Sequence, residues 1–500
     1  MSENFYQEID QRIFLVNEQS YGYPYDPQTD RAAWTKLGAT FPHVIPINII
    51  ADSFDYDIPK IIKEKIYAIG GGKHPTVIAN TKQEPVEITF ETKMQYAIFK
   101  AYAIGSVAST GTRPEVTVIT FATVTDSSAQ GKYFLVNGID ASGEEHFAVW
   151  LDTAGDGSTG KPAVEGIAAD HVLAANVSGA VDPTNPTAAE ISAAVHAIMN
   201  ADAAFGTVDG TGSVTVTNAL DGAVRDARDS GADPMGISVS ITQQGVNTHT
   251  VTENVTANLP SFTIHIEQQN RGDSGEDIVI DLFGCVIDSY EVSVDYGEGT
   301  VTESVTFRCP HYAVGTKLTN PPPFADTLEP HTWANLKESA SNNIFMEGII
   351  DKTPTSVNSV RFTVGNNVDF QPDIGVRYNR YHIAKKREVS LNIVGFSENR
   401  DSLDYYLDEW DNVNQRYSSA SGRLNSKLKL QRDATYDYSD LSVYNWLLEE
   451  HNHNIVSIDD GIKGIDITLT DATPDSNRRI IDSFSIVDYL SDTCYQNSFS

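Results

Sequence analysis

The segment FGCVIDSYEVSVDYGEGTVTESVTFRC, residues 283–309, decides the fold of this chain. Within it the apolar side chains Tyr290, Val292 and Val294 alternate with polar ones, and a period of two is typical of a half-buried strand. The glycine-rich GEG at 297–299 then supplies a turn before a second alternating run. The segment therefore predicts a β-hairpin with one apolar and one polar face.

Short alternating runs of the same kind precede and surround this hairpin. They are HVIPINII (43–50), EPVEITFETKM (84–94), PSFTIHIEQ (260–268) and EDIVIDLFG (276–284). Alternation over five to eight positions favours antiparallel strands with one buried face. We therefore predict a mainly β chain, of the α+β kind, in which helices flank the sheets.

The composition changes between residues 105 and 248, which predicts a separately folded insert. The window 101–250 is poor in aromatic residues and holds 17 acids against 5 bases. Its one strong helix signal is PTNPTAAEISAAVHAIMNAD (183–202), where Thr187 and Glu190 have the spacing of a capping box. Strand-like runs precede and follow this helix. We expect a small α+β domain here.

The rest of the chain reads as two related halves separated by the Pro-rich PPPFADTLEP, residues 321–330. Each half has strands around a long polar hairpin tip, and the two halves end in similar segments, 278–296 and 465–489. We interpret this as an internal duplication, with chance similarity between β-rich segments as the alternative. The predicted domains are 1–104 with 249–320, the insert 105–248, and 331–500.

Two stretches of the second half have the spacing of amphipathic helices. They are NRDSLDYYLDEWDNVNQRY (399–417) and YSDLSVYNWLLEEH (438–451), each with one apolar stripe. We expect both helices to cover a face of the second sheet.

The net charge of −33 disfavours tight binding to nucleic acid or to anionic membranes, because phosphate contacts rely on Lys and Arg. The acidic start MSENFYQEID does not resemble an export signal, and no run approaches the roughly 20 apolar residues of a membrane span. We therefore expect synthesis in the cytoplasm and no contact with a membrane. Solubility alone is the alternative explanation of the charge.

Motifs for chemistry are weak throughout. The glycines at 68–75 lack the Ser or Thr of a phosphate loop, and 152–160 breaks the spacing of a calcium loop. The best metal candidate is EEHNHN, with Glu449, Glu450, His451 and His453, and a solvated helix end is the favoured interpretation of it. The three cysteines, Cys285, Cys309 and Cys494, are expected to be buried free thiols. We expect no enzyme, no cofactor and no bound metal.

The hairpin at 283–309 resembles the closing hairpin of tail tube proteins of tailed phages. The matching residues are Gly284, Cys285, Val286, Ser289, Val292, Val294, Gly297, Val301, Ser304, Val305 and Phe307. The resemblance implies two β-sandwich or barrel domains with flanking helices, while the insert resembles a small module of phage structural proteins. It also implies a structural protein of the virion tail, assembled in the host cytoplasm, whose rings stack into a channel for the genome.

The same resemblance implies the partners. The chain would associate with itself and with other tail proteins (tape measure, terminator and baseplate), while double-stranded DNA would pass through the lumen without specific binding. Because one chain carries two such domains, three chains would form a ring with pseudo-sixfold symmetry. The insert would then project outward as three knobs on each ring.

The long hairpin tips at 51–83 and 366–386 are the expected sites of contact between subunits or rings, with ordinary exposed loops as the alternative. The contact candidates are Phe54, Tyr56, Lys73, His74, Asp369, Phe370, Asp373, Arg377, Tyr378, Arg380 and Tyr381. Two other function classes stay open. One is a different virion component, such as a baseplate hub, terminator or decoration protein, and the other is a glycan-binding surface protein.

Overall fold

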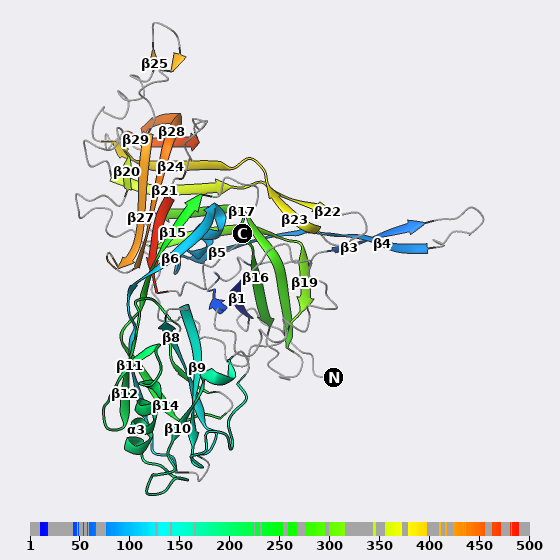
Figure 1. Ribbon diagram of the computed structural model, residues 1–500. Coiled ribbons are helices and arrows are strands. Elements are labelled where there is room, and N and C mark those ends of the chain that lie inside the picture. The colour runs from blue at the N-terminus through cyan, green and yellow to red at the C-terminus, as the bar shows by residue number, and fades with distance from the viewer. Residues whose placement is uncertain are drawn as a thin grey trace, which may run out of the picture.

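A computed structural model describes most of the chain (Figure 1). The described residues are 11–18, 44–47, 49, 54, 58, 60–66, 77–125, 129–140, 143–164, 167–224, 226–230, 233–253, 259–268, 277–295, 300–315, 344–346, 356–372, 379–397, 410–411, 416–417, 424–433, 435, 437–455, 463–471, 481 and 483–489. The architecture is mainly β, as predicted, with several antiparallel sheets.

The first repeat is built around one long strand, β17, that follows from the alternating segment 278–295. Its strands are β1 (Gln11–Asn17), β2 (Val44–Pro46), β3 (Lys60–Ile66), β4 (Val77–Glu84), β5 (Val86–Lys93), β16 (Phe262–Gln268), β17 (Ile278–Asp295), β18 (Val301–Cys309) and β19 (His311–Val314). Strand β17 pairs antiparallel with β18, which confirms the predicted hairpin. Tyr290, Val292 and Val294 are buried while Glu291 and Ser293 are half-exposed, so its two faces differ as expected.

The second repeat has its own long strand, β28. Its strands are β20 (Ile344–Met346), β21 (Ser356–Gly365), β22 (Val368–Pro372), β23 (Asn379–Ala384), β24 (Glu388–Ser397), β25 (Trp410–Asp411), β26 (Arg416–Tyr417), β27 (Leu424–Asp433), β28 (Asp437–Ile455), β29 (Lys463–Asp471) and β30 (Ser483–Asp488). Strand β28 pairs with β27, β29 and β30, all antiparallel.

The strand pairings repeat between the two halves, which supports the duplication. In the first half β16, β18 and β19 pair with β17, β5 pairs with β18, and β1 pairs with β16. In the second half β27, β29 and β30 pair with β28, β24 pairs with β29, and β20 pairs with β27. An arm hairpin precedes β5 as β3–β4, and another precedes β24 as β22–β23. The counterpart of β17 is therefore β28.

The two segments that look alike in the sequence do not occupy equivalent places in the repeats. Residues 278–295 are one continuous strand, whereas 465–489 contributes to two separate strands, β29 and β30. The counterpart by strand pairing is 437–455, which contains the segment 438–451 for which the sequence predicts a helix.

Both helix predictions for the second half are wrong in the described residues. Residues 438–451 belong to β28, and Trp410 and Tyr417 pair in the short ladder β25–β26. The β28 segment is rich in Tyr, Val, Leu and Trp, and it lies between β27 on one side and β29 with β30 on the other. Pairing with neighbours that are distant in sequence overrides an apolar spacing that also fits a helix.

The two repeats share one sheet of 16 strands. Strand β21 pairs with β17 along Ser289–Asp295, and β30 pairs with β15 (Val246–Glu253). The second join is supported by side chains, because His249 Nε2 lies 3.1 Å from Asp488 Oδ1 and its Nδ1 lies 2.7 Å from Ser109 Oγ. The described strands close no barrel.

One hydrophobic core runs beneath both repeats. It includes Phe90, Phe262 and Phe307 from the first repeat and Phe362 and Leu391 from the second. The short helix α2 (Ile98–Ile104) lies within it, with all seven residues buried. Even Lys100 is fully buried there, and its Nζ donates to Ser439 Oγ at 2.6 Å. This helix therefore connects the core of the first repeat to β28.

The insert rises from a two-stranded stem, β6 (Gly105–Arg113) paired with β15, and lies at the bottom of Figure 1. It has a separate core between two four-stranded sheets and helix α3 (Ala188–Met199). Its remaining elements are β7 (Val116–Phe121), β8 (Tyr133–Asp140), β9 (Gly143–Asp152), η2 (Ala169–His171), β10 (Val172–Asn176), β11 (Phe205–Asp209), β12 (Ser213–Asn218), β13 (Arg228–Asp229) and β14 (Ile237–Gln243). The capping box of Thr187 and Glu190 is confirmed.

Two further expectations concern membranes and thiols. No helix in the described part of the chain is long and apolar enough to cross a membrane. Cys285 and Cys309 are buried free thiols, as expected, and burial raises the pKa of Cys285 well above its ordinary value. Cys494 lies outside the described residues.

Candidate functional site

The most distinctive surface is the solvent-facing side of the sheet β5–β18–β17–β21–β24. The strand registers place its side chains in three rows that cross both repeats. We call the following set the hydroxyl face: Thr89, Glu91, Lys93, Ser289, Glu291, Ser293, Thr302, Ser304, Thr306, Arg361, Thr363, Gly365, Glu388, Ser390 and Asn392. Every one of them is exposed or half-exposed, and most are small and uncharged.

Cross-strand hydrogen bonds hold the hydroxyl face in order. Thr89 and Thr306 share a 2.8 Å hydrogen bond between their hydroxyl groups, and Lys93 Nζ donates to Thr302 Oγ1 at 2.8 Å. Arg361 Nε lies 3.1 Å from Glu291 Oε1. Both cations of the face therefore contact neighbours on the same sheet, and the charge of Arg361 is paired with that of Glu291.

The opposite side of the same hairpin is closed to water. Glu303 points into the core from β18, where Tyr290 Oη donates to its Oε1 at 2.6 Å. Burial raises the pKa of Glu303 to about 7, while the Tyr290 hydrogen bond and the charge of Lys100 lower it. The sheet is thus a wall with a packed inner side and a hydroxyl-rich outer side.

A glycine lies at the point where β17 changes its pairing partners. Gly284 has φ 63°, in the region that favours glycine, and it lies where the β16 register shifts. Its N–H donates to Glu18 Oε1 at 2.7 Å. Before this point β17 pairs with β16 and β19, and beyond it with β18 and β21.

Two arms extend from the body toward the same side (Figure 1). They are the hairpins β3–β4 and β22–β23, and each forms a two-stranded sheet of its own. An isolated two-stranded hairpin is marginally stable in water and needs packing from elsewhere. The arms are therefore suited to contact a neighbouring molecule.

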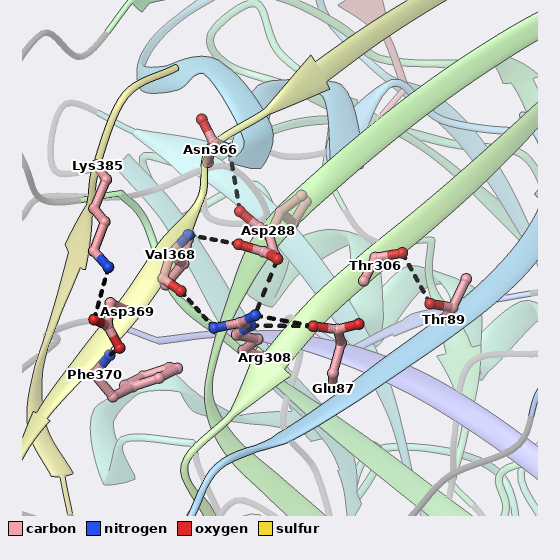
Figure 2. Close-up of polar contacts among 11 residues, drawn as sticks. Glu87, Thr89, Asp288, Thr306, Arg308, Asn366, Val368, Asp369, Phe370 and Lys385 are labelled. Carbon is pink, nitrogen blue, oxygen red and sulfur yellow. Dashed lines mark hydrogen bonds and ion pairs between the residues drawn. The ribbon is translucent and has the colours of Figure 1, made fainter. Parts of the chain in front are cut away.

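The base of the second arm is fastened to the first repeat through Arg308, as Figure 2 shows. Its Nη1 donates to Val368 O at 2.7 Å, and its Nη2 lies 3.1 Å from Glu87 Oε2. Asp288 completes the contact, because its Oδ1 accepts from Val368 N at 2.5 Å and its Oδ2 lies 3.5 Å from Arg308 Nε. The base of the second arm is therefore anchored to β5, β17 and β18 of the first repeat.

Apolar packing and a neutral histidine complete this base. Val368 and Phe370 form a cluster with Leu259 and Val286. The Leu259 N–H donates to His382 Nε2 at 2.9 Å, and burial lowers the pKa of His382 to about 4. The histidine is thus neutral near pH 7 and acts as an acceptor.

The predicted contact residues differ in burial and in the groups that they contact. Phe370 is only 8% exposed, and its side chain packs within its own chain. Phe54 is half-buried and meets Phe90 edge to face at 6.2 Å, so it too packs internally. Asp369 is exposed and pairs with Lys385 at 2.9 Å.

The other arm candidates are described only in part. Arg380 and Tyr381 lie in β23, and Tyr381 pairs with Gln371 across the ladder. Outside the described residues lie Tyr56, Lys73, His74, Asp373, Arg377 and Tyr378.

The hairpin residues that carried the resemblance occupy distinct positions. Cys285, Val292, Val294 and Phe307 are buried, while Ser289 and Ser304 belong to the hydroxyl face. Gly284 forms the bend in β17, and Gly297 lies outside the described residues.

The structure describes parts of two candidate ion sites. Asp152 accepts from the N–H groups of Ala154, Gly155 and Gly157, and Asp156 caps the following turn, so this loop closes on itself. His451 and His453 pair with Ile467 and Ile465, whereas Glu450 pairs with Thr468 on the other face of β28. No group of three metal-ligating side chains occurs in the part of the chain that the structure describes. Residues 68–75 lie outside that part.

The hydroxyl face as a whole was not predicted, although its signal is visible in the sequence. Polar residues recur at alternate positions in EITFETK, VTESVTF and EVSLNIV, and the positions between them are mostly apolar, with Thr92 and Glu303 as exceptions. The signal becomes a surface only when the registers align these strands. No protein-family model matches this chain, and no curated protein matches it either.

Proposed function

We propose that this protein is the subunit of a viral tail tube, which polymerises into stacked rings around the channel that delivers the genome. Each ring holds three chains and has pseudo-sixfold symmetry because every chain carries two repeats. The protein resides in the virion tail after assembly in the host cytoplasm. The tape measure, terminator and baseplate proteins contact the tube that it forms.

The observation that carries this proposal is the hydroxyl face, which crosses both repeats without interruption. A channel for DNA needs a wall without strong phosphate sites, because each contact with Lys or Arg holds the duplex. On this face Lys93 and Arg361 are engaged by Thr302 and Glu291, and hydroxyl groups occupy most other positions. The net charge of −33 adds a repulsive field around the duplex.

The arms and the shared sheet support the same function. Two hairpins, each a separate two-stranded sheet, extend to one side, where the next ring of a stack would lie (Figure 1). The repeats join edge to edge through β17 and β21, which is the kind of contact that continues around a ring. A wall, a lateral contact and an axial contact are the parts that a tube requires.

Electron microscopy of the purified full-length chain at high concentration tests the proposal. Hollow tubes or stacked rings with three insert knobs per ring are expected. A protein that stays monomeric at every concentration would contradict it. Copy number in the virion separates a tube subunit, which is abundant, from a hub, terminator or decoration protein.

A further inference from the structure

We propose that a second copy of this chain pairs the edge of its first repeat with residues 447–455 of β28, in the way that β21 pairs with β17 inside one chain. The inference rests on the proposed tube function, since it names the contact between copies in a ring. It follows from a comparison of the two long strands.

Strand β17 is covered on both sides along its length. On one side lie β18 and then β19, which continue each other along β17. On the other side lie β16, opposite Ile278–Cys285, and β21, opposite Ser289–Asp295. Strand β21, which covers Ser289–Asp295, belongs to the second repeat.

Strand β28 repeats this arrangement with one place left open. On one side lie β29 and then β30, as β18 and β19 do on β17. On the other side β27 pairs with Asp437–Trp446, as β16 does. Among the described strands, none pairs with the remaining edge at 447–455. This edge corresponds to the part of β17 that β21 covers.

The first repeat carries a matching edge. In the second repeat β21 lies beside β24, on the side away from β29. In the first repeat Ile49 forms an antiparallel bridge to Thr92 of β5, the counterpart of β24. Ile49 thus occupies the place of β21 beside β5. A second copy would present this edge to β28.

The faces of the two edges agree. The row of buried residues Val294, Val360 and Ile393 continues to Ile467 and then to His451 of β28. Ile465 pairs with His453, so both histidine positions lie on the core side of the sheet. Ile49 packs against the same core. Because the donor and acceptor edges differ, the contact runs head to tail, and such contacts close into a ring when the rotation allows.

Cysteine cross-linking of full-length tubes tests the contact. The variants combine Ile49→Cys with either His451→Cys or His453→Cys, in a background that carries Cys494→Ser. Ile49→Cys with Glu450→Cys is the matched control, because Glu450 lies on the same edge but pairs with Thr468 on the opposite face. Tube formation under reducing conditions, seen by electron microscopy, shows that each variant folds.

After mild oxidation, at least one of the two histidine-position variants should give dimers and trimers on a denaturing gel. The product should stop at the trimer, because a closed ring of three chains has no free end, and the control should stay monomeric. Tubes that yield only monomers in both variants would overturn the inference and leave the tube function standing. Cross-linked trimers that never stack into tubes would support the contact and contradict the tube function. Products beyond the trimer would overturn closure by three chains.

Discussion

Arg387 and Glu253 form a buried ion pair between the two repeats, with Nη1 of the guanidinium 3.0 Å from Oε1 of the carboxylate. Arg387 directly precedes β24, and Glu253 is the last residue of β15. Arg387 Nε also donates to Asn366 Oδ1 at 2.9 Å, and Glu253 Oε2 accepts from Ile481 N at 3.1 Å. The pair therefore connects four segments at the junction of the repeats.

Replacing Arg387 by Ala should destabilise the chain strongly. Removing one partner of a buried ion pair leaves an uncompensated charge, which costs about 3–5 kcal/mol. The matched control is Lys385→Ala, because Lys385 pairs with Asp369 on the surface, and exposed pairs contribute less than about 1 kcal/mol. Urea unfolding checks the difference. Equal losses in the two variants would show that the buried pair does not stabilise the junction.

Acid should loosen the second arm through His382. Burial holds the pKa of His382 at about 4, below its ordinary 6.5, so the folded state resists the proton. The histidine therefore contributes stability above pH 6.5 that is lost as pH falls toward 4. Amide exchange at Leu259, whose N–H bonds to His382, should accelerate over this range once the intrinsic rate is subtracted. His382→Gln should remove the acid-dependent part of the change, and an unchanged profile would refute the assignment.

Alkali should weaken the first repeat through His265. Burial disfavours its charge, but hydrogen bonds to Asp281 at 2.5 Å and Glu267 at 3.2 Å outweigh this and raise its pKa to about 9. The contribution is present in full below pH 6.5 and is lost as pH rises through 9. It amounts to about 3 kcal/mol. The thermal midpoint of the native chain should fall over this range, and the midpoint of His265→Gln should not follow it.

Positive charge on the hydroxyl face should make the tube retain DNA. Ser304→Lys with Thr306→Lys adds two cations at half-exposed positions of β18. Tubes of this variant should sediment with double-stranded DNA at low salt and release it at high salt, because binding of this kind depends on counterion release. Thr120→Lys, exposed on the insert, is the control and should bind far less. Equal retention by both would place the hydroxyl face outside the channel.

The insert should be dispensable for assembly. The stem β6–β15 stays paired as far as Arg113 and Val246, so residues 114–245 can be replaced by an Asn-Gly turn that closes the stem as a hairpin. The shortened chain should still form tubes of the same lumen diameter, without the three outer knobs. Loss of tubes, with the shortened chain still folded by circular dichroism, would mean that the insert takes part in assembly.

The elements that could be predicted from sequence are those whose signals are local. The hairpin of β17 and β18 follows from strict alternation, and the start of α3 follows from the spacing of Thr187 and Glu190. The insert was recognisable by composition because its core is separate from that of the repeats.

The elements that sequence reasoning missed depend on distant partners. In β28, Leu441, Tyr444 and Leu448 have helical spacing, and only pairing with β27 and β29 makes this segment a strand. The burial of Phe370 likewise depends on Leu259 and Val286, which the chain brings together through the join of β21 with β17. Alternation reveals which residues share a face of each strand. The rows of the hydroxyl face can be predicted only when the registers between neighbouring strands are known.

The join of β17 with β21 would also change how fast the proposed ring can begin to assemble. Six separate units would have to meet through successive collisions, and each collision is opposed by the mutual repulsion of acidic molecules. In this chain half of those meetings have already happened by the end of folding, at the high effective concentration that a covalent tether provides. The rate of ring formation would then depend on a lower power of the protein concentration. For the proposed ring, the fusion of two units would therefore be a kinetic advantage as well as an architectural one.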